Sequence, residues 1–301
     1  MLDLSEIKKF GNIELLARQM VEGFITGLHK SPYHGFSVEF AEHRLYNTGE
    51  STRHIDWKVF ARTDKLFVKR YEEETNLRAK ILLDVSSSMF YPKEDHGKLT
   101  FSVMAAAALA YMLQKQRDAV GLTTFSDTVQ TETPIKSSQT HVRQLFLHFQ
   151  RLLDTPTPQG KTTSAAEMIH QVAARLHRRS LVIIFSDMLD NQADPEELFS
   201  ALQHLKHNRH EVLLFHVQDH ATELDFEFAD RPHRFVDLET GESLKLQPAE
   251  VRSYYQQKSK ERYQELKLRC GKYKIDFIEA DIRKNLDQIL VPYLIKRTRM
   301  R

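Results

Sequence analysis

The chain has 301 residues, of which 41% are hydrophobic and 28% charged, and its 43 basic and 41 acidic side chains give a net charge of +2. Such a near balance leaves no electrostatic case for nucleic acid as the main partner. The single cysteine, Cys270, excludes a disulfide within the chain, and the longest mainly apolar run, residues 101–113, is shorter than the ~20 residues that a membrane span needs. The first residues also lack the basic and apolar stretches of a signal peptide. We therefore expect a cytoplasmic protein without a membrane span.

The first part of the chain predicts a helix followed by a small mixed segment. Apolar side chains recur at helical spacing over residues 4–28 and alternate with polar ones over residues 36–40, as in a strand. A short helix is expected over residues 55–61 and a short strand over residues 66–71. We assign residues 1–78 to an N-terminal helix with an α+β segment.

From residue 79 onward, strands and helices alternate. Strands are expected over 79–84, 119–125, 128–134, 180–186, 211–217 and 275–279, helices over 99–116, 141–153, 164–178, 195–208, 248–268 and 285–295, and a hairpin over 234–246. Most of these strands are nearly continuous apolar runs, which is typical of a parallel sheet covered by helices on both faces. Residues 79–301 are therefore predicted to form an α/β domain with a doubly wound, mostly parallel sheet. The basic tail 296–301 is expected to be solvated, with an acidic partner surface or membrane headgroups as the alternative.

The strand predicted over residues 79–84 ends in an Asp-x-Ser-x-Ser sequence that begins at its last residue. It places Asp84, Ser86 and Ser88 at steps of two, and residues two apart in an extended chain point the same way. The three side chains can therefore converge, and oxygen ligands suit a hard cation such as Mg²⁺. Because hydroxyls are neutral, a cation held mainly by them keeps positive charge to attract a carboxylate. The pattern favours a binding site over a hydrolytic one.

Two further loops are expected at the same edge of the sheet, because ligands of open α/β sheets bind at the carboxyl ends of the strands. Thr162 lies in the loop 160–163, and Asp187 directly follows the strand predicted over residues 180–186. Thr163 is a rival to Thr162, and Asp190 is a weaker rival to Asp187. Ser and Asp are common helix N-caps, so any one loop could serve only as a cap. Three such loops in this order favour a site.

This order of Asp-x-Ser-x-Ser, Thr and Asp resembles the metal-ion-dependent adhesion site of the von Willebrand factor A fold. The resemblance implies that Ser86 and Ser88 ligate Mg²⁺ directly and that Thr162 does so directly or through water. Asp84 and Asp187 would hold coordinated water and orient the shell. One position would stay open for an Asp or Glu of a protein partner. Mn²⁺ and Ca²⁺ are the alternatives to Mg²⁺.

A block of charged and aromatic residues precedes the sheet domain. It reads His-Gly-Phe-Ser-Val-Glu-Phe-Ala-Glu-His-Arg-Leu-Tyr over 34–46, Gly-Glu over 49–50, Arg-His-Ile-Asp-Trp-Lys-Val-Phe-Ala-Arg over 53–62 and Lys-Arg-Tyr-Glu-Glu-Glu over 69–74. Together with residues 237–242 and 248–252, this block resembles the bacterial family catalogued as domain of unknown function 58. Members of that family commonly accompany AAA+ ATPases of the MoxR type. The resemblance therefore implies an adaptor or co-chaperone of such an ATPase.

Four residues of this block have two open interpretations. Asp56 beside Trp57, with Arg53 and Arg62 nearby in sequence, can build a buried ion-pair network that locks the N-terminal segment onto the sheet domain. They can equally form a partner-binding face, since Trp and Arg are enriched in such faces.

The function predicted from these features is non-enzymatic: a protein-interaction module that binds a partner's carboxylate through Mg²⁺. One alternative is a metal-dependent hydrolase with Asp84 or Asp187 as nucleophile or base. That chemistry usually needs several direct carboxylates and nearby cations, and Lys161 is the only cation expected beside the site. The other alternative is a structural protein whose metal site is vestigial.

Overall fold

The computed structural model describes residues 12–29, 43–45, 57–69, 77–92, 97–155, 165–177, 179–189 and 195–299. The chain divides into two compact units, one formed by Met1–Phe24 with Leu77–Arg301 and the other by Ile25–Asn76. The division at residue 78 expected from the sequence stays a prediction. The strand expected over residues 36–40 lies outside the described residues.

After the end of α2 (Ile13–His29), the described residues of the smaller unit form one short helix and two short strands. The helix α3 (Trp57–Thr63) and the strand β2 (Phe67–Lys69) confirm two of the predicted elements, and β2 pairs antiparallel with β1 (His43–Leu45), which the sequence did not predict. Within α3 the rings of Trp57 and Phe60 meet edge to face with centroids 6.1 Å apart, as expected for residues three apart on one helix face.

A six-stranded sheet forms the centre of the larger unit. Its strands are β3 (Arg78–Asp84), β4 (Ala119–Phe125), β5 (Val129–Glu132), β6 (Leu181–Ser186), β7 (Glu211–Gln218) and β10 (Asp276–Asp281), in the spatial order β10-β7-β6-β3-β4-β5. All neighbouring pairs are parallel except β4 and β5. The predicted α/β fold with a mostly parallel sheet is confirmed.

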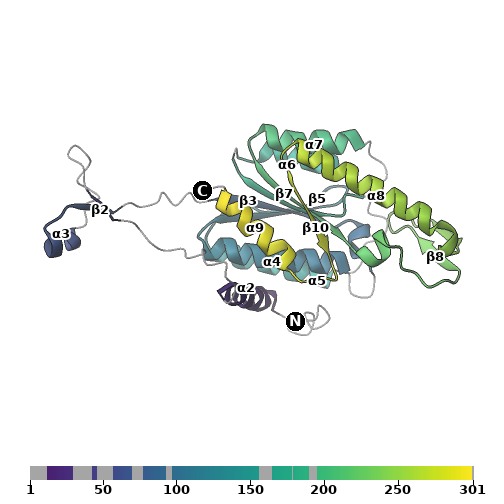
Figure 1. Cartoon of the computed structure of the whole chain (residues 1–301), viewed down its shortest axis with the longest axis horizontal. Helices are drawn as coiled ribbons and strands as arrows, with labels where there is room; N and C mark the ends of the chain where they lie inside the picture. The colour runs from purple at the N-terminus through teal and green to yellow at the C-terminus, as the bar shows by residue number, and fades with distance from the viewer. Residues whose placement is uncertain are drawn as a thin grey trace. The chain divides into compact units, whose positions relative to one another are not determined.

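Helices cover both faces of this sheet. They are α4 (Gly97–Lys115), α5 (Gln139–Asp154), α6 (Ala165–Arg175), α7 (Pro195–His207), α8 (Pro248–Lys272) and α9 (Asp287–Arg299), and α2 (Ile13–His29) precedes them. Figure 1 shows α6, α7 and α8 on one face and α4, α5 and α9 on the other. In the part of the chain that the structure describes, no helix is both long and apolar enough to cross a membrane.

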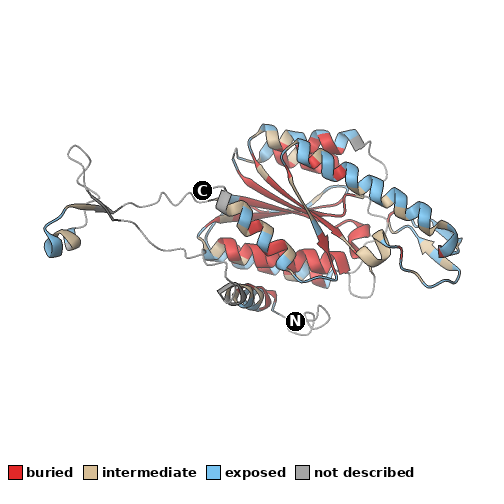
Figure 2. Cartoon of the chain, in the orientation of Figure 1, coloured by how far each residue is buried: buried red, intermediate tan, exposed pale blue. Residues whose placement is uncertain are grey.

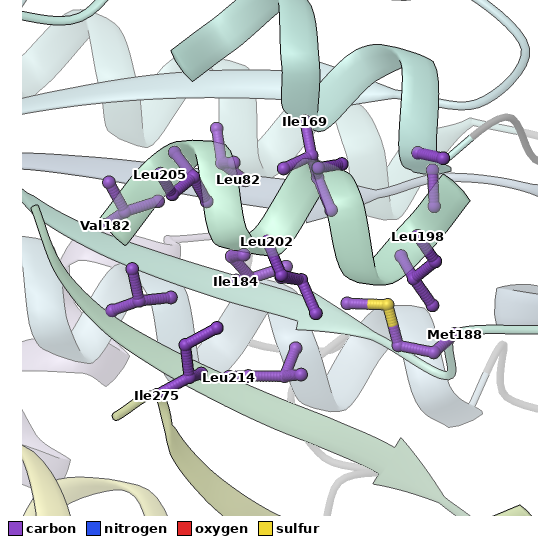
Figure 3. Packing of buried hydrophobic residues seen from close by; sticks show 14 of the residues in the cluster. Leu82, Ile169, Val182, Ile184, Met188, Leu198, Leu202, Leu205, Leu214 and Ile275 are labelled. Carbon is purple, nitrogen blue, oxygen red and sulfur yellow. The ribbon is translucent and has the colours of Figure 1, made fainter. Parts of the chain in front are cut away.

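The core on the α6–α7 face is a continuous layer of aliphatic side chains (Figure 3). The sheet contributes alternate residues of neighbouring strands, and the helices contribute one apolar stripe each. The members seen in the figure include Leu82, Ile169, Val182, Ile184, Leu198, Leu202, Leu205 and Leu214. The intervening strand residues point to the opposite face, where the rings of Phe185 and Phe215 stack with centroids 4.9 Å apart.

Helix α4 is buried along almost its whole length, in contrast to the largely exposed α8 (Figure 2). Its alanines 105–108 are fully buried, and small side chains let neighbouring backbones approach closely. A helix that is apolar all round belongs inside a core. The exception at its start is Lys98, a charged residue with only 1% of its surface exposed.

The segment between β7 and β10 carries the predicted hairpin. Its strands are β8 (His233–Val236) and β9 (Ser243–Leu246), and the ring of Phe226 attaches them to α8 by stacking on Phe235 and packing against Tyr255. A short π-helix, η3 (His220–Leu224), directly follows β7 and was not predicted.

Candidate functional site

The site lies where the order of the strands switches. Strand β3 comes first in the sheet's sequence order, yet it lies between β4 and β6. Helix α4 leads from β3 to β4 on one face of the sheet, and α6 leads into β6 on the other face, so the strand order switches between β3 and β6 (Figure 1). In open α/β sheets, ligands bind at the carboxyl ends of the strands beside such a switch. Asp84 ends β3, and Asp187 directly follows β6.

Asp84 is fully buried and is held by two hydrogen bonds. The backbone N–H of Ser86 donates to Oδ1 at 2.9 Å, and the hydroxyl of Ser186 donates to Oδ2 at 2.6 Å. The Ser86 hydroxyl lies 3.1 Å from the hydroxyl of Ser88. Ser86 precedes the 3₁₀-helix η2 (Ser87–Phe90), but its side chain makes no capping hydrogen bond. The interpretation of this loop as a helix cap alone is therefore not supported.

Asp187 lies in the second loop, with both carboxylate oxygens engaged. Lys98 Nζ donates to Oδ2 at 2.7 Å, and the backbone N–H of Leu189 donates to Oδ1 at 3.1 Å. His216 Nε2 donates to the Asp187 carbonyl at 3.0 Å, so this nitrogen carries the proton. Met188, with φ +50°, turns the chain sharply, and Arg262 donates to its carbonyl at 2.8 Å.

The buried charges of the site influence one another strongly. Burial, aided by the negative charge of Asp187, raises the pKa of Asp84 to about 7. Burial also acts to raise the pKa of Asp187, but the charge and hydrogen bond of Lys98 outweigh it and the pKa is lowered. Burial disfavours the Lys98 ammonium, yet attraction to Asp187 and Glu223 raises its pKa above the ordinary range. Both members of the Lys98–Asp187 pair are therefore charged.

The residues present fit a divalent cation held mainly by hydroxyls and water. In an octahedral shell with Mg–O bonds of about 2.1 Å, neighbouring ligands lie about 3.0 Å apart. The two serine hydroxyls, 3.1 Å apart, match that spacing. Asp84, Asp187 and Glu223 also outnumber the one cation, Lys98, that contacts them among the described residues. The described residues contain no metal-binding group of three or more His, Cys, Asp or Glu, so a metal here would depend on the serines.

The structure describes only part of the predicted residue set. Asp84, Ser86, Ser88 and Asp187 lie close to one another in it. Outside the described residues lie Thr162 and its rival Thr163, Asp190, Lys161, Arg53 and Asp56. Of the family-specific block, Trp57 is 60% exposed on α3 and Arg62 is exposed in the last turn of the same helix.

Four contributors to the site were missed by the sequence analysis. Among the described residues, which do not include Lys161, Lys98 lies within hydrogen-bond distance of a site carboxylate. Glu223, His216 and Arg262 hold Lys98 or the loop after β6 in place. A charged residue opening an otherwise apolar, alanine-rich helix was the one available signal, and it pointed to Lys98.

Comparison with known proteins gives the family. A profile described as "Protein of unknown function DUF58" matches residues 42–265. The chain belongs to this family. The resemblance drawn from the charged and aromatic block is thereby confirmed.

Mycobacterial relatives are similar to this chain over part of their length. Uncharacterized proteins of Mycobacterium tuberculosis and Mycobacterium bovis are 26% identical over 209 residues, which cover 69% of this chain and 63% of each relative. The match therefore spans less than two thirds of these relatives.

Solved structures show more distant similarity. BatB from Bacteroides thetaiotaomicron is 14% identical, with 75% of this chain and all of that chain covered and a TM-score of 0.43. An aerotolerance-related membrane protein from Bacteroides fragilis is 13% identical, with 73% of this chain and 97% of that chain covered and a TM-score of 0.43.

Proposed function

We propose that this protein is a non-enzymatic interaction module with a von Willebrand factor A-like adhesion site, which binds an Asp or Glu side chain of a protein partner through a divalent cation, preferentially Mg²⁺. The observation that supports it is the convergence of Asp84, Ser86, Ser88 and Asp187 at the carboxyl ends of two adjacent strands. Ser86 and Ser88 would ligate the cation, and the two carboxylates would hold its water molecules.

The arrangement of the carboxylates supports binding rather than hydrolysis. A nucleophile or general base has to be aimed at the substrate. Hydrogen bonds to both oxygens instead hold Asp84 and Asp187 in fixed orientations, and each oxygen keeps a lone pair that can accept a hydrogen bond from metal-bound water. The cation supplies positive charge for a carboxylate ligand, while the chain's own carboxylates only orient the site.

The proposed partner is a MoxR-type AAA+ ATPase or one of its clients, in the cytoplasm. This part rests on the family, whose members commonly accompany such ATPases. The exposed side chains of Trp57 and Arg62 make α3 a candidate second contact, because Trp and Arg often dominate binding energy in interfaces.

Metal titration by calorimetry tests the proposal directly. The metal-free protein should bind one Mg²⁺, and Ser86→Ala or Ser88→Ala should weaken that binding about ten-fold or more. Ser102→Ala is the matched control, because Ser102 is equally buried on α4 and its hydroxyl has no partner among the described residues. Wild type that binds no divalent cation would refute the proposal.

A second experiment tests the partner. A purified MoxR-type ATPase from the same genome should bind wild type in Mg²⁺, and should lose this binding in EDTA or with Ser86→Ala. Retention in EDTA would place the contact elsewhere. Mg²⁺-dependent turnover of phosphate esters that disappears in Asp84→Asn would establish the hydrolase instead.

A further inference from the structure

Lys98 is the most unusual charged residue of the described chain. It lies in the first turn of α4 with 1% of its surface exposed, and its ammonium bridges two carboxylates. Nζ lies 2.7 Å from Asp187 Oδ2 and 2.7 Å from Glu223 Oε1. These partners come from the loop after β6 and from η3, so one side chain joins three segments.

Glu223 holds the ammonium in a fixed place. While one of its oxygens accepts from Lys98, the other accepts from the backbone N–H of Asp219 at 2.7 Å. Asp219 is itself clamped by Arg283 through two hydrogen bonds of 2.6 and 3.0 Å. The ammonium therefore cannot follow Asp187 if that side chain moves.

This arrangement limits what Asp187 can do. Direct ligation of a cation by Oδ2 would bring the cation close to the Lys98 ammonium, a like charge that donates a short, charge-assisted hydrogen bond to the same oxygen. Oδ1 is engaged by the backbone N–H of Leu189. A buried ion pair is also costly to form, so it often serves geometry more than net stability.

We propose that Lys98, anchored by Glu223, is a positioning residue that keeps Asp187 from ligating the cation directly and so leaves the cation's charge for the partner's carboxylate. This inference rests on the proposed function. It assigns a role to two residues, Lys98 and Glu223, that ligate nothing themselves. A merely structural lysine would, when removed, loosen the site and weaken metal binding. A positioning lysine would, when removed, strengthen it.

The test is metal affinity, measured by calorimetry with Mg²⁺ and Mn²⁺. The variant Lys98→Met/Glu223→Gln removes the ammonium without leaving the Glu223 charge buried alone. Freed to ligate directly, Asp187 should raise the metal affinity about ten-fold or more. Lys80→Met is the matched control, because Lys80 is also a buried lysine, on β3, but it donates to the Thr133 carbonyl away from the site. Its metal affinity should equal that of wild type.

A double-mutant cycle gives a second readout. Asp187→Asn should cost metal affinity only about ten-fold in the wild-type background, where the side chain acts through water, and about a hundred-fold where Lys98 is absent. If the double variant does not fold, Lys98→Gln keeps a hydrogen-bond donor without the charge, and a smaller rise in affinity is expected.

The outcomes separate this inference from the proposed function. An unchanged or weaker metal affinity in the folded variants, or equal costs of Asp187→Asn in both backgrounds, would overturn the role of Lys98 while leaving the metal site intact. If wild type binds no metal but the Lys98 variants do, the proposed function fails and the restraint by Lys98 is supported. Absence of binding in all of them would overturn both.

Discussion

Ion pairs between lysine or arginine and carboxylates lie at both ends of the central sheet, but the two groups of ion pairs differ. At the amino ends of the strands, Lys296 pairs with Glu211 and Asp276 at 2.6 and 2.7 Å, and Arg297 pairs with Asp118 at 2.6 Å. At the carboxyl ends, Lys98 faces Asp187 and Glu223, and Asp84 adds a further buried carboxyl group.

Both burial and charge balance distinguish these two ends, because Lys98 and Asp187 are almost fully buried whereas Lys296, Glu211 and Asp276 are partly exposed. Among the described residues of the amino end, Lys206 also contacts Glu211, so three cations meet three carboxylates. The charges of these residues therefore balance, and their ion pairs hold α9 against the sheet. At the carboxyl end three carboxyl groups lie near one described cation, Lys98, and burial, aided by the charge of Asp187, raises the pKa of Asp84 to about 7. Strongly shifted pKa values of this kind are common at functional sites.

The largest loss of stability is expected when an ion pair at the amino ends of the strands is removed. Arg297→Met removes the guanidinium that lies 2.6 Å from the Asp118 carboxylate, whose side chain is only 2% exposed, and this should lower the free energy of unfolding by about 3 kcal/mol. Urea unfolding in Mg²⁺ and in EDTA should give the same loss. Arg231→Met, an exposed arginine, is the control and should change little. A loss of stability that differs between Mg²⁺ and EDTA would show that the ion pairs at the amino ends are coupled to the metal site at the carboxyl ends.

The carboxyl end should respond to metal instead. At a free Mg²⁺ concentration of about 100 times its dissociation constant, the unfolding free energy should rise by about 2.7 kcal/mol relative to EDTA. Ser86→Ala should abolish this increment, whereas Arg297→Met should keep it. An increment that survives in Ser86→Ala would place the metal elsewhere.

A pH effect of intermediate size should arise at His216, which supports the loop after β6. Burial lowers its pKa from 6.5 to about 4, so between these values the unfolded chain binds a proton that the folded chain does not. Stability contributed by the neutral ring is complete above pH 6.5 and is lost as the pH falls toward 4. At pH 5 the loss should be about 2 kcal/mol.

The check for His216 is the difference between two proteins. His216→Gln can still donate to the Asp187 carbonyl but does not titrate. Its unfolding free energy should therefore fall less than that of wild type between pH 7 and pH 5. Equal losses in the two proteins would show that His216 is accessible to protons in the folded state.

The smallest effect is expected at a helix cap beside the amino end. The hydroxyl of Ser138 accepts from the backbone N–H of His141 at the start of α5, and the distance of 3.4 Å is long. Ser138→Ala should cost about 0.5–1 kcal/mol in urea unfolding, with or without Mg²⁺. Ser138→Asp, which also caps, should restore the loss. Failure of the aspartate to do so would remove capping as the cause.

The sequence was sufficient for the sheet and for half of the site. Buried parallel strands are continuous apolar runs, so β3, β4 and β6 were predicted to within one residue. Asp84 and Asp187 were found because each follows such a strand directly. The family-specific block was recognisable because its order of charged and aromatic residues is distinctive.

The rest depended on contacts between distant segments. Lys98 and Glu223 are 125 residues apart, and neither belongs to a local pattern that predicts the other. The basic tail was expected to be solvated, but Lys296 and Arg297 are each only 15% exposed and form ion pairs, because α9 packs back onto the amino end of the sheet. Periodicity in the sequence indicates which face of a helix or strand is apolar. It does not indicate which charged side chains of other segments will pair with that element.

The hydrogen bond from Arg262 to the Met188 carbonyl has a consequence for the order of assembly during synthesis. Its two residues are 74 positions apart, and the later one lies in α8. A chain growing on the ribosome therefore exposes the loop after β6 well before the residue that fastens it has been made. The ion pair between Lys98 and Glu223 likewise forms only after residue 223 has been synthesised. Nascent chains that end before α8 therefore lack the hydrogen bond that holds the loop after β6 in its folded position.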